Sequence, residues 1–177
     1  MDLSAIGHQR TVGHEALPGF VRACQADDAF ESLLRLLDEA MARAPGHRLL
    51  TVLVYFADKR EAQRVYSSRP VEYPVGGRKT LSQAPRMQQV LTTGLAYISR
   101  TRQEIIDNFP DHPKLLAMGC ESIVNMPVRW GSTVLGTVNL MHREGHYHAN
   151  DLPRIEAWSQ LVVPAFMAMI FAPQSKG

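Results

Sequence analysis

Two asparagines stand inside stretches that otherwise read as apolar strands: Asn125 in residues 121–130 (ESIVNMPVRW) and Asn139 in residues 133–142 (TVLGTVNLMH). Asparagine is disfavoured in strands, and a buried amide without hydrogen-bond partners is costly. Each amide both donates and accepts, so the pair suits a small ligand that is neutral or that carries a carboxylate or a ring carbonyl. The alternative is bonding to nearby loop backbone. We expect both residues to bind a ligand.

Pro127 lies close to this pair and removes one donor from the strand ladder, which is typical of a β-bulge. A bulge there would bring Asn125 and Asn139 onto one face of the sheet. We also expect Ile123 and Met141, from the same two strands, to line the ligand site.

Several tyrosines lie on or near other expected strands. Ordinary packing with the hydroxyl group in water is one interpretation of them. If two of them line one cavity, that cavity would favour a flat or aromatic ligand. The tyrosines that we expect at the site are Tyr55, Tyr66 and Tyr97, and Tyr73 lies on a further short segment.

Three residues are weak candidates for catalysis: Cys120, Glu121 and His142. A nucleophilic thiol needs a base and a positive environment, whereas Glu121 would raise the pKa of its neighbour Cys120. His142 ends the strand of Asn139 and could act as an acid or base at a pocket mouth. Its run HREGHYH (142–148) holds three histidines, but surface histidines are common, so we expect no metal and no cofactor.

The elements that must position these residues follow from periodicity and turn signals. Apolar residues at helical spacing after Asp28, ended by Pro45-Gly46, predict a helix over 27–44. A second helix runs from Pro85 to Gly94, and a last one begins at Asn150 or Asp151 and is kinked by Pro164. The expected strands are 49–56, 61–68, a short one at 71–73, 95–99, and the hairpin 121–130 and 133–142.

The order of these elements predicts an α+β fold with an antiparallel sheet. The helices at the two ends would pack on one face, and the irregular residues 69–119 would cover a pocket on the other. We expect a single domain over residues 27–172, preceded by an arm over 1–26 and followed by a tail over 173–177.

Composition excludes several classes of protein. The 177 residues are 45% hydrophobic and 20% charged, with a net charge of +2 and scattered basic residues, so we expect no nucleic-acid partner. The start MDLSAIGHQR lacks the pattern of a secretory signal, and no stretch approaches the ~20 apolar residues that span a bilayer. Two widely separated cysteines fit no zinc pattern. We therefore expect a cytoplasmic protein that does not enter a membrane.

Three segments together resemble the GAF domain family: VLTTGLAYIS, AMGCESIVNMPV and WGSTVLGTVNL, followed by an acidic residue that opens the last helix. The resemblance covers about residues 30–170 and departs at Tyr147-His148, where the family often has a phenylalanine. It implies a PAS-related, six-stranded antiparallel sheet with helices behind it and a small-molecule pocket in front. It also implies dimerisation through the terminal helices.

Signatures of individual GAF subfamilies narrow the range of possible ligands. Asn108-Phe109 lacks the lysine and acidic pair of the cyclic-nucleotide branch, and Cys120 lacks the following His or Leu of the bilin branch. The methionine sulfoxide reductase branch has acids where Asn139 and Met141 stand here, so we do not expect that reaction. The sequence predicts a homodimeric protein that senses or binds a small metabolite. It leaves open an enzyme of the same fold, acting on a small polar or aromatic metabolite, and a module that binds another protein.

Overall fold

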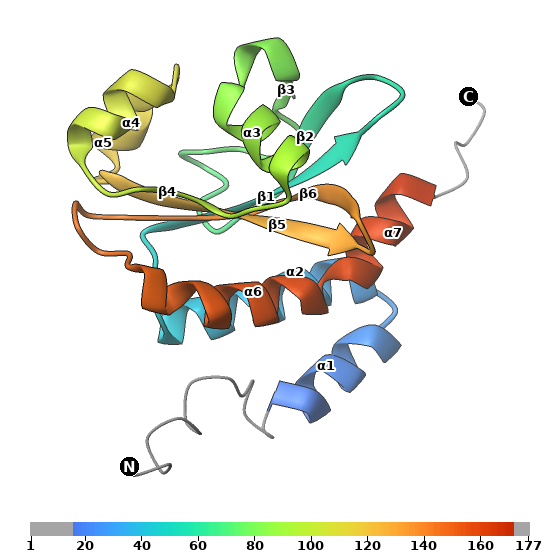
Figure 1. Ribbon diagram of the computed structural model, residues 1–177. Coiled ribbons are helices and arrows are strands. Elements are labelled where there is room, and N and C mark those ends of the chain that lie inside the picture. The colour runs from blue at the N-terminus through green and yellow to red at the C-terminus, as the bar shows by residue number, and fades with distance from the viewer. Residues whose placement is uncertain (1–15, 172–177) are drawn as a thin grey trace, which may run out of the picture.

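A computed structural model describes residues 16–171, and a six-stranded antiparallel sheet lies at its centre (Figure 1). The strand order is β3-β2-β1-β6-β5-β4. The strands are β1 (Leu49–Phe56), β2 (Glu61–Ser67), β3 (Arg78–Thr80), β4 (Tyr97–Ser99), β5 (Ser122–Trp130) and β6 (Thr133–His142). The long apolar strands β1, β5 and β6 form the buried middle of the sheet, and the short strands lie at its edges. The fold class predicted from the sequence is therefore confirmed.

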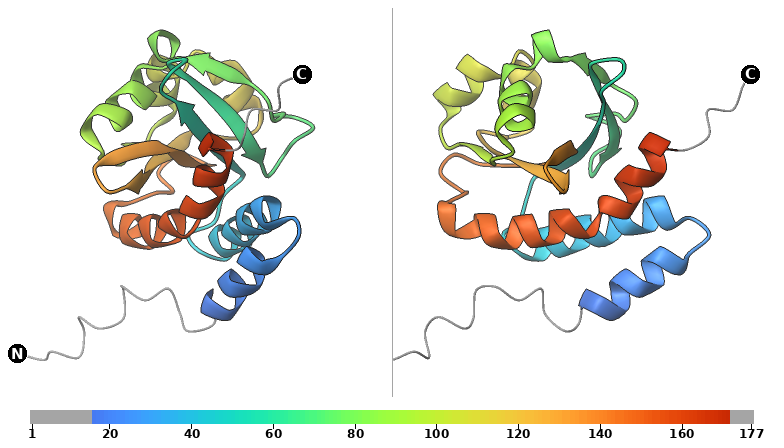
Figure 2. Two further views of the ribbon diagram at one scale, coloured as in Figure 1. Left: turned by 90° about the vertical axis from the view of Figure 1, so that its right-hand side faces the viewer. Right: turned by 45° about the vertical axis from the view of Figure 1, so that its right-hand side comes forward.

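Four helices form a layer behind the sheet: α1 (Ala16–Gln25), α2 (Ala29–Arg43), α6 (Leu152–Leu161) and α7 (Val163–Phe171). Helices α2 and α6 run side by side beneath the strands, and α1 packs outside α2 (Figure 2). Apolar side chains at helical spacing on α2 meet the sheet, and Leu34, Leu37 and Met41 are almost fully buried. The main hydrophobic core thus lies between this layer and the back of the sheet.

The other face of the sheet is covered by short elements. These are the 3-10 turn η2 (Leu81–Gln83), α3 (Pro85–Thr93), α4 (Arg102–Asn108) and α5 (His112–Ala117). Pro85 opens α3, and Gly94 ends it in the left-handed conformation that a residue without Cβ adopts freely. Thr101 and Glu104 form a capping box that starts α4. Residues 69–119 therefore form the cover that the sequence predicts.

Two details differ from the expectation. Residues 71–73 form a turn and no strand, and the edge strand β3 comes five residues later, where Arg78, Lys79 and Thr80 pair with β2. The last helix is interrupted more sharply than by a kink. Pro164 has no N–H to donate, so α6 ends at Leu161 and α7 begins at Val163. The one-turn helix η3 (Ala149–Asp151) directly precedes α6.

Helix α1 lies within the predicted N-terminal arm, and its Ala16 and Ala23 belong to the main core. The predicted tail and the first 15 residues lie outside the described residues. The limits of the domain stay a prediction. Among residues 16–171, no helix combines the length and apolar character needed to cross a membrane.

Candidate functional site

A pocket lies between the front of the sheet and the cover. Its volume is about 630 Å³, counting the space that opens to solvent. The floor consists of alternate residues of β1, β6 and β5, because successive side chains of a strand point to opposite faces. The walls come from β2, β3, α3 and the α4–α5 connection. The floor residues are Thr51, Leu53, Ile123, Asn125, Thr137, Asn139 and Met141.

The two asparagines lie side by side at the centre of this floor. Asn125 and Asn139 are direct partners in the antiparallel register of β5 and β6. Asn125 Nδ2 donates to Asn139 Oδ1 at 2.6 Å, and Asn139 Nδ2 donates to Thr51 Oγ1 at 3.2 Å. Asn125 Oδ1 is buried and has no hydrogen-bond partner among the described residues. The pair therefore presents one free acceptor at the floor.

The bulge expected at Pro127 is not what aligns the asparagines. Pro127 pairs with Thr137 in regular register, and the irregularity follows it, between Val128 and Arg129. Asn125 and Asn139 share a face simply because directly opposed residues of antiparallel strands do so.

A bulge in β2 brings a guanidinium into the pocket. Leu53 pairs with Arg64 and Val52 with Tyr66, so Val65 has no partner on β1. The extra residue sends Arg64 to the pocket face and Tyr66 to the helix face. Arg64 is 8% exposed; its Nη1 donates to Pro74 O at 2.7 Å, and its guanidinium lies 3.8 Å from the Tyr73 ring centroid. Its Nε is buried without a partner among the described residues.

Three segments of the wall meet at Asp111, which precedes α5. Its Oδ2 accepts hydrogen bonds from the Tyr73 hydroxyl and from Lys79 Nζ, the latter at 3.0 Å. Burial raises the pKa of this carboxyl, but the Lys79 ammonium and the two hydrogen bonds outweigh burial and hold it below its usual value. Burial and the same carboxylate raise the pKa of Tyr73. Asp111 therefore stays ionised and joins β3, the 69–77 loop and α5.

Arg86 of α3 forms the opposite wall. Its Nε donates to Asn108 Oδ1 at 2.8 Å, its Nη1 donates to Gln89 Oε1 at 3.0 Å, and its guanidinium lies 4.8 Å from the Tyr97 ring centroid. These partners are neutral, and no carboxylate of the described residues lies within 4 Å of the Arg86 guanidinium nitrogens.

The structure brings together some of the residues expected at the site. Asn125, Asn139, Ile123 and Met141 all line the pocket. Tyr66 lies on the other face of the sheet, where its hydroxyl donates to Asp38 Oδ2 of α2 at 2.7 Å.

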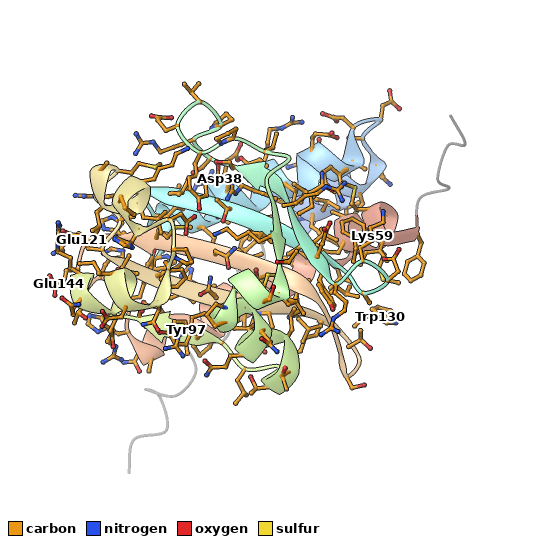
Figure 3. The ribbon with its side chains drawn as sticks, turned by 90° about the horizontal axis from the view of Figure 1, so that it is seen from above. Asp38, Lys59, Tyr97, Glu121, Trp130 and Glu144 are labelled. Carbon is orange, nitrogen blue, oxygen red and sulfur yellow. The ribbon has the colours of Figure 1, made fainter. Side chains whose placement is uncertain are left out.

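Tyr55 and Tyr97 are half-buried and are not among the described residues that line the pocket. Tyr97 lies beside the cover helices (Figure 3), where its ring lies under the Arg86 guanidinium and its backbone pairs with that of Asn125 across β4 and β5. Ligand contact by any of these residues stays a prediction.

The three catalytic candidates do not line the pocket, as far as residues 16–171 show. Cys120 is buried in a small apolar cluster, and burial raises its thiol pKa to about 11. Glu121 forms a 2.9 Å ion pair with Arg102 at the end of the sheet remote from Lys59 and Trp130 (Figure 3). The ring of His142 stacks on that of His146, with centroids 3.6 Å apart.

The histidine run is held by contacts of its own. His146 Nε2 lies 2.9 Å from Pro45 O, and the buried Tyr147 donates to Gly46 O at 3.0 Å. Tyr147 therefore fills the position that a phenylalanine often has in the resembled family. No group of three His, Cys, Asp or Glu side chains within residues 16–171 is arranged to hold a metal ion.

Sequence reasoning missed the charged wall. The residues concerned are Arg64, Lys79, Arg86 and Asp111, all of which line the pocket. An arginine in a short strand that reads as polar is a weak signal, because which face it occupies depends on a bulge that the sequence does not mark. Asp111 lies between Pro110 and Pro113 in a segment with no long element, and the available signal was an acidic residue just before a proline-containing short helix.

Comparison with known proteins gives only structural matches. No protein-family model matches the chain, and no curated protein does. A segment of a methyl-accepting chemotaxis protein superposes with a TM-score of 0.67 at 16% identity, covering 87% of this chain and 99% of that one. The GAF domain of a two-component sensor histidine kinase from Bacillus halodurans gives 0.66 at 11% identity, covering 78% and 94%.

A third match is an enzyme. The free methionine-R-sulfoxide reductase from Neisseria meningitidis, solved in complex with its substrate, gives a TM-score of 0.65 at 11% identity and covers 89% of this chain and 93% of that one. Identities this low show the fold and nothing finer. The sequence resemblance and these superpositions agree: the chain has the fold of GAF domains.

Proposed function

We propose that this protein binds a small metabolite in the pocket between the sheet and the 69–119 cover, as a sensor or carrier. The observation that carries the proposal is the buried, unpartnered Oδ1 of Asn125 at the pocket floor. A buried acceptor left without a donor costs roughly 1–3 kcal/mol, so a ligand that supplies the donor gains that interaction. Folds of this kind also serve sensor kinases, as one structural match illustrates.

No observation on residues 16–171 favours the alternative of an enzyme. The Cys120 thiol has its pKa raised to about 11, so it is protonated at neutral pH, and it lies outside the pocket lining. Glu121 is engaged by Arg102, and His142 stacks on His146. These three side chains do not converge with the asparagines on one reacting atom.

The test is native mass spectrometry of the protein purified without denaturation from its own cells. We expect a bound molecule of a few hundred daltons or less that is released by acid. In Asn139→Leu the bridge between Asn125 and Thr51 is lost, so occupancy should fall to background. Asn150→Leu is the matched control, because Asn150 is exposed on η3, and it should keep the molecule.

Retained occupancy in Asn139→Leu would contradict the proposed site. Circular dichroism and a thermal melt of each variant show whether the fold is intact. Cys120→Ser should bind as the natural protein does, because Cys120 packs behind pocket-lining residues and does not line the pocket itself.

We also propose that the protein is a homodimer through its terminal helices. Large apolar side chains are exposed on this layer: Leu17 and Val21 on α1 and Phe171 at the end of α7 are 61%, 44% and 69% exposed. Leu17 and Val21 are four residues apart on α1 and so share one face of it, and exposed apolar surface of this kind favours contact with another apolar surface. A second copy would supply one that is identical.

A further inference from the structure

We propose that the ligand is a small organic carboxylate that also carries a hydroxyl or ammonium donor, and that Arg64 holds the carboxylate. This rests on the proposed function, because it names the chemical class that the same pocket takes. The observations that support it are the free edge of Arg64, the charge of the pocket wall and the unpartnered acceptors.

Arg64 has one side of its guanidinium occupied and the other free. Nη1 donates to Pro74 O at 2.7 Å, and a Cβ on Gly77 would lie 3.1 Å from Nη1, so that corner faces the 69–77 loop. Nε is buried with no partner in the described part of the chain. The Nε–Nη2 edge presents two parallel N–H groups, which match the two oxygens of a carboxylate.

The charges of the wall favour an anion. Arg64, Lys79 and Arg86 face a pocket in which Asp111 is the one carboxylate among the described lining residues. Asp111 is paired with Lys79 at 3.0 Å, which leaves the two guanidiniums without a counter-ion within 4 Å among residues 16–171. A charge that is more than nine-tenths buried, as Arg64 is, is costly unless paired. An anionic ligand supplies that pair.

Two acceptors require a donor on the same molecule. Asn125 Oδ1 at the floor and Asp111 Oδ1 at the wall are both buried and unpartnered within the described residues. A hydroxyl or ammonium group satisfies either of them. Apolar side chains complete the lining and suit a short hydrocarbon body: Leu53, Met87, Phe109, Leu115, Ile123 and Met141.

The experiment measures binding by calorimetry and thermal shift to a probe set at millimolar concentration. The set holds 2-hydroxy, 2-amino and unsubstituted carboxylic acids with two- to eight-carbon bodies, the primary amide of each acid, and inorganic phosphate. We expect at least one hydroxy or amino acid to bind. Its primary amide and its unsubstituted acid should each bind about 10-fold more weakly or worse, since each lacks one charged or hydrogen-bonded contact.

Variants of Arg64 test the assigned residue. Arg64→Gln should lower the affinity for the tightest-binding acid about 10- to 100-fold. Arg64→Lys should recover part of that loss, because lysine restores the positive charge but not the two parallel N–H groups of the guanidinium. Arg35→Gln is the matched control: Arg35 is an exposed arginine on α2, paired with Asp28, and its loss should leave the affinity unchanged.

Several outcomes overturn the inference. They are equal binding of an acid and its amide, tighter binding of inorganic phosphate than of every acid, no binding by any acid, or full affinity in Arg64→Gln. The comparison of acid with amide is made on the natural protein, so it stands even if the Arg64 variants fail to fold. A neutral amide whose binding is abolished by Asn139→Leu would leave the proposed function intact while refuting the carboxylate.

Discussion

His142 is a histidine whose environment favours the neutral ring. Burial, and then the neighbouring His146, lower the pKa of His142 to about 4, and its Nδ1 accepts a hydrogen bond from the Arg143 N–H at 2.8 Å. In an unfolded chain the pKa is about 6.5. Between these two values the unfolded chain binds more protons than the folded chain, so stability is present above pH 6.5 and is lost as pH falls towards 4.

Replacing this residue should therefore flatten the acid side of the stability curve. We expect His142→Gln to lose less stability than the natural protein when the pH is lowered from about 6.5 to about 4.5. The measurement is the urea midpoint at a series of pH values. His148→Gln is the control, because His148 is exposed in the same segment, and it should follow the natural protein. Superimposable curves for His142→Gln and the natural protein would contradict the account.

The sequence identified the two asparagines of the pocket floor but not the charged side chains of its wall. Asn125 and Asn139 could be predicted because an amide in an apolar strand conflicts with strand propensity and burial. Arg64 is in a strand that reads as polar, so an arginine there conflicts with neither strand propensity nor the expected exposure. Its burial depends on the stack over the Tyr73 ring and on the loop carbonyl of Pro74. Such partners come from tertiary structure, which spacing along the chain does not reveal.

Strand β6 approaches both β1 and α7 closely at Gly136. A Cβ there would lie 2.1 Å from Leu53 O and 2.7 Å from Phe166 Cε1. The oxygen belongs to the backbone of β1 and cannot move aside, so the sheet would have to deform. This glycine lets β6 pair with β1 while packing against Phe166 of α7, and β6 carries Asn139 to the pocket.

Gly136→Ala should destabilise the protein by roughly 3 kcal/mol, as an overpacked core position does. The measurement is urea unfolding followed by circular dichroism. Gly131→Ala is the matched control: Gly131 has a φ of 59° in the hairpin turn but no atom within 4 Å of a built Cβ. The left-handed backbone conformation alone should lower the free energy of unfolding of Gly131→Ala by about 1–2 kcal/mol. Equal losses for the two variants would contradict the close approach.

The major elements could be predicted from periodicity and turn residues, while the cover could be predicted only as irregular. The strand 49–56 matches β1 at both ends, and Gly131-Ser132 joins β5 to β6 as expected. Strand β3 was missed because Arg78, Lys79 and Thr80 have neither alternation nor apolar character, and they pair with β2 as a sheet edge. Bulges in β2 and in the hairpin also left no clear signal.

For the whole molecule, the helical layer decides how two copies would meet. We expect sedimentation equilibrium to give a dimer for the natural protein at micromolar concentrations. Val21→Glu with Leu17→Glu should give a monomer, because two carboxylates would then have to be buried against the partner. Val71→Glu is the control: Val71 is 90% exposed in the cover, on the other face of the sheet, and the variant should remain dimeric.

A natural protein that sediments as a monomer would refute the dimer, and a dimer that survives both α1 substitutions would place its interface elsewhere. The cytoplasmic location stays a prediction from the sequence.

The most direct test of the central claim is a crystal structure of the protein purified from its own cells. We predict unexplained electron density between the sheet and the cover, within hydrogen-bonding distance of Asn125 Oδ1 and bordered by Arg64 and Asp111. A space filled by side chains packed directly against Asn125 and Asn139 would contradict the claim, as would both amides opening to bulk water.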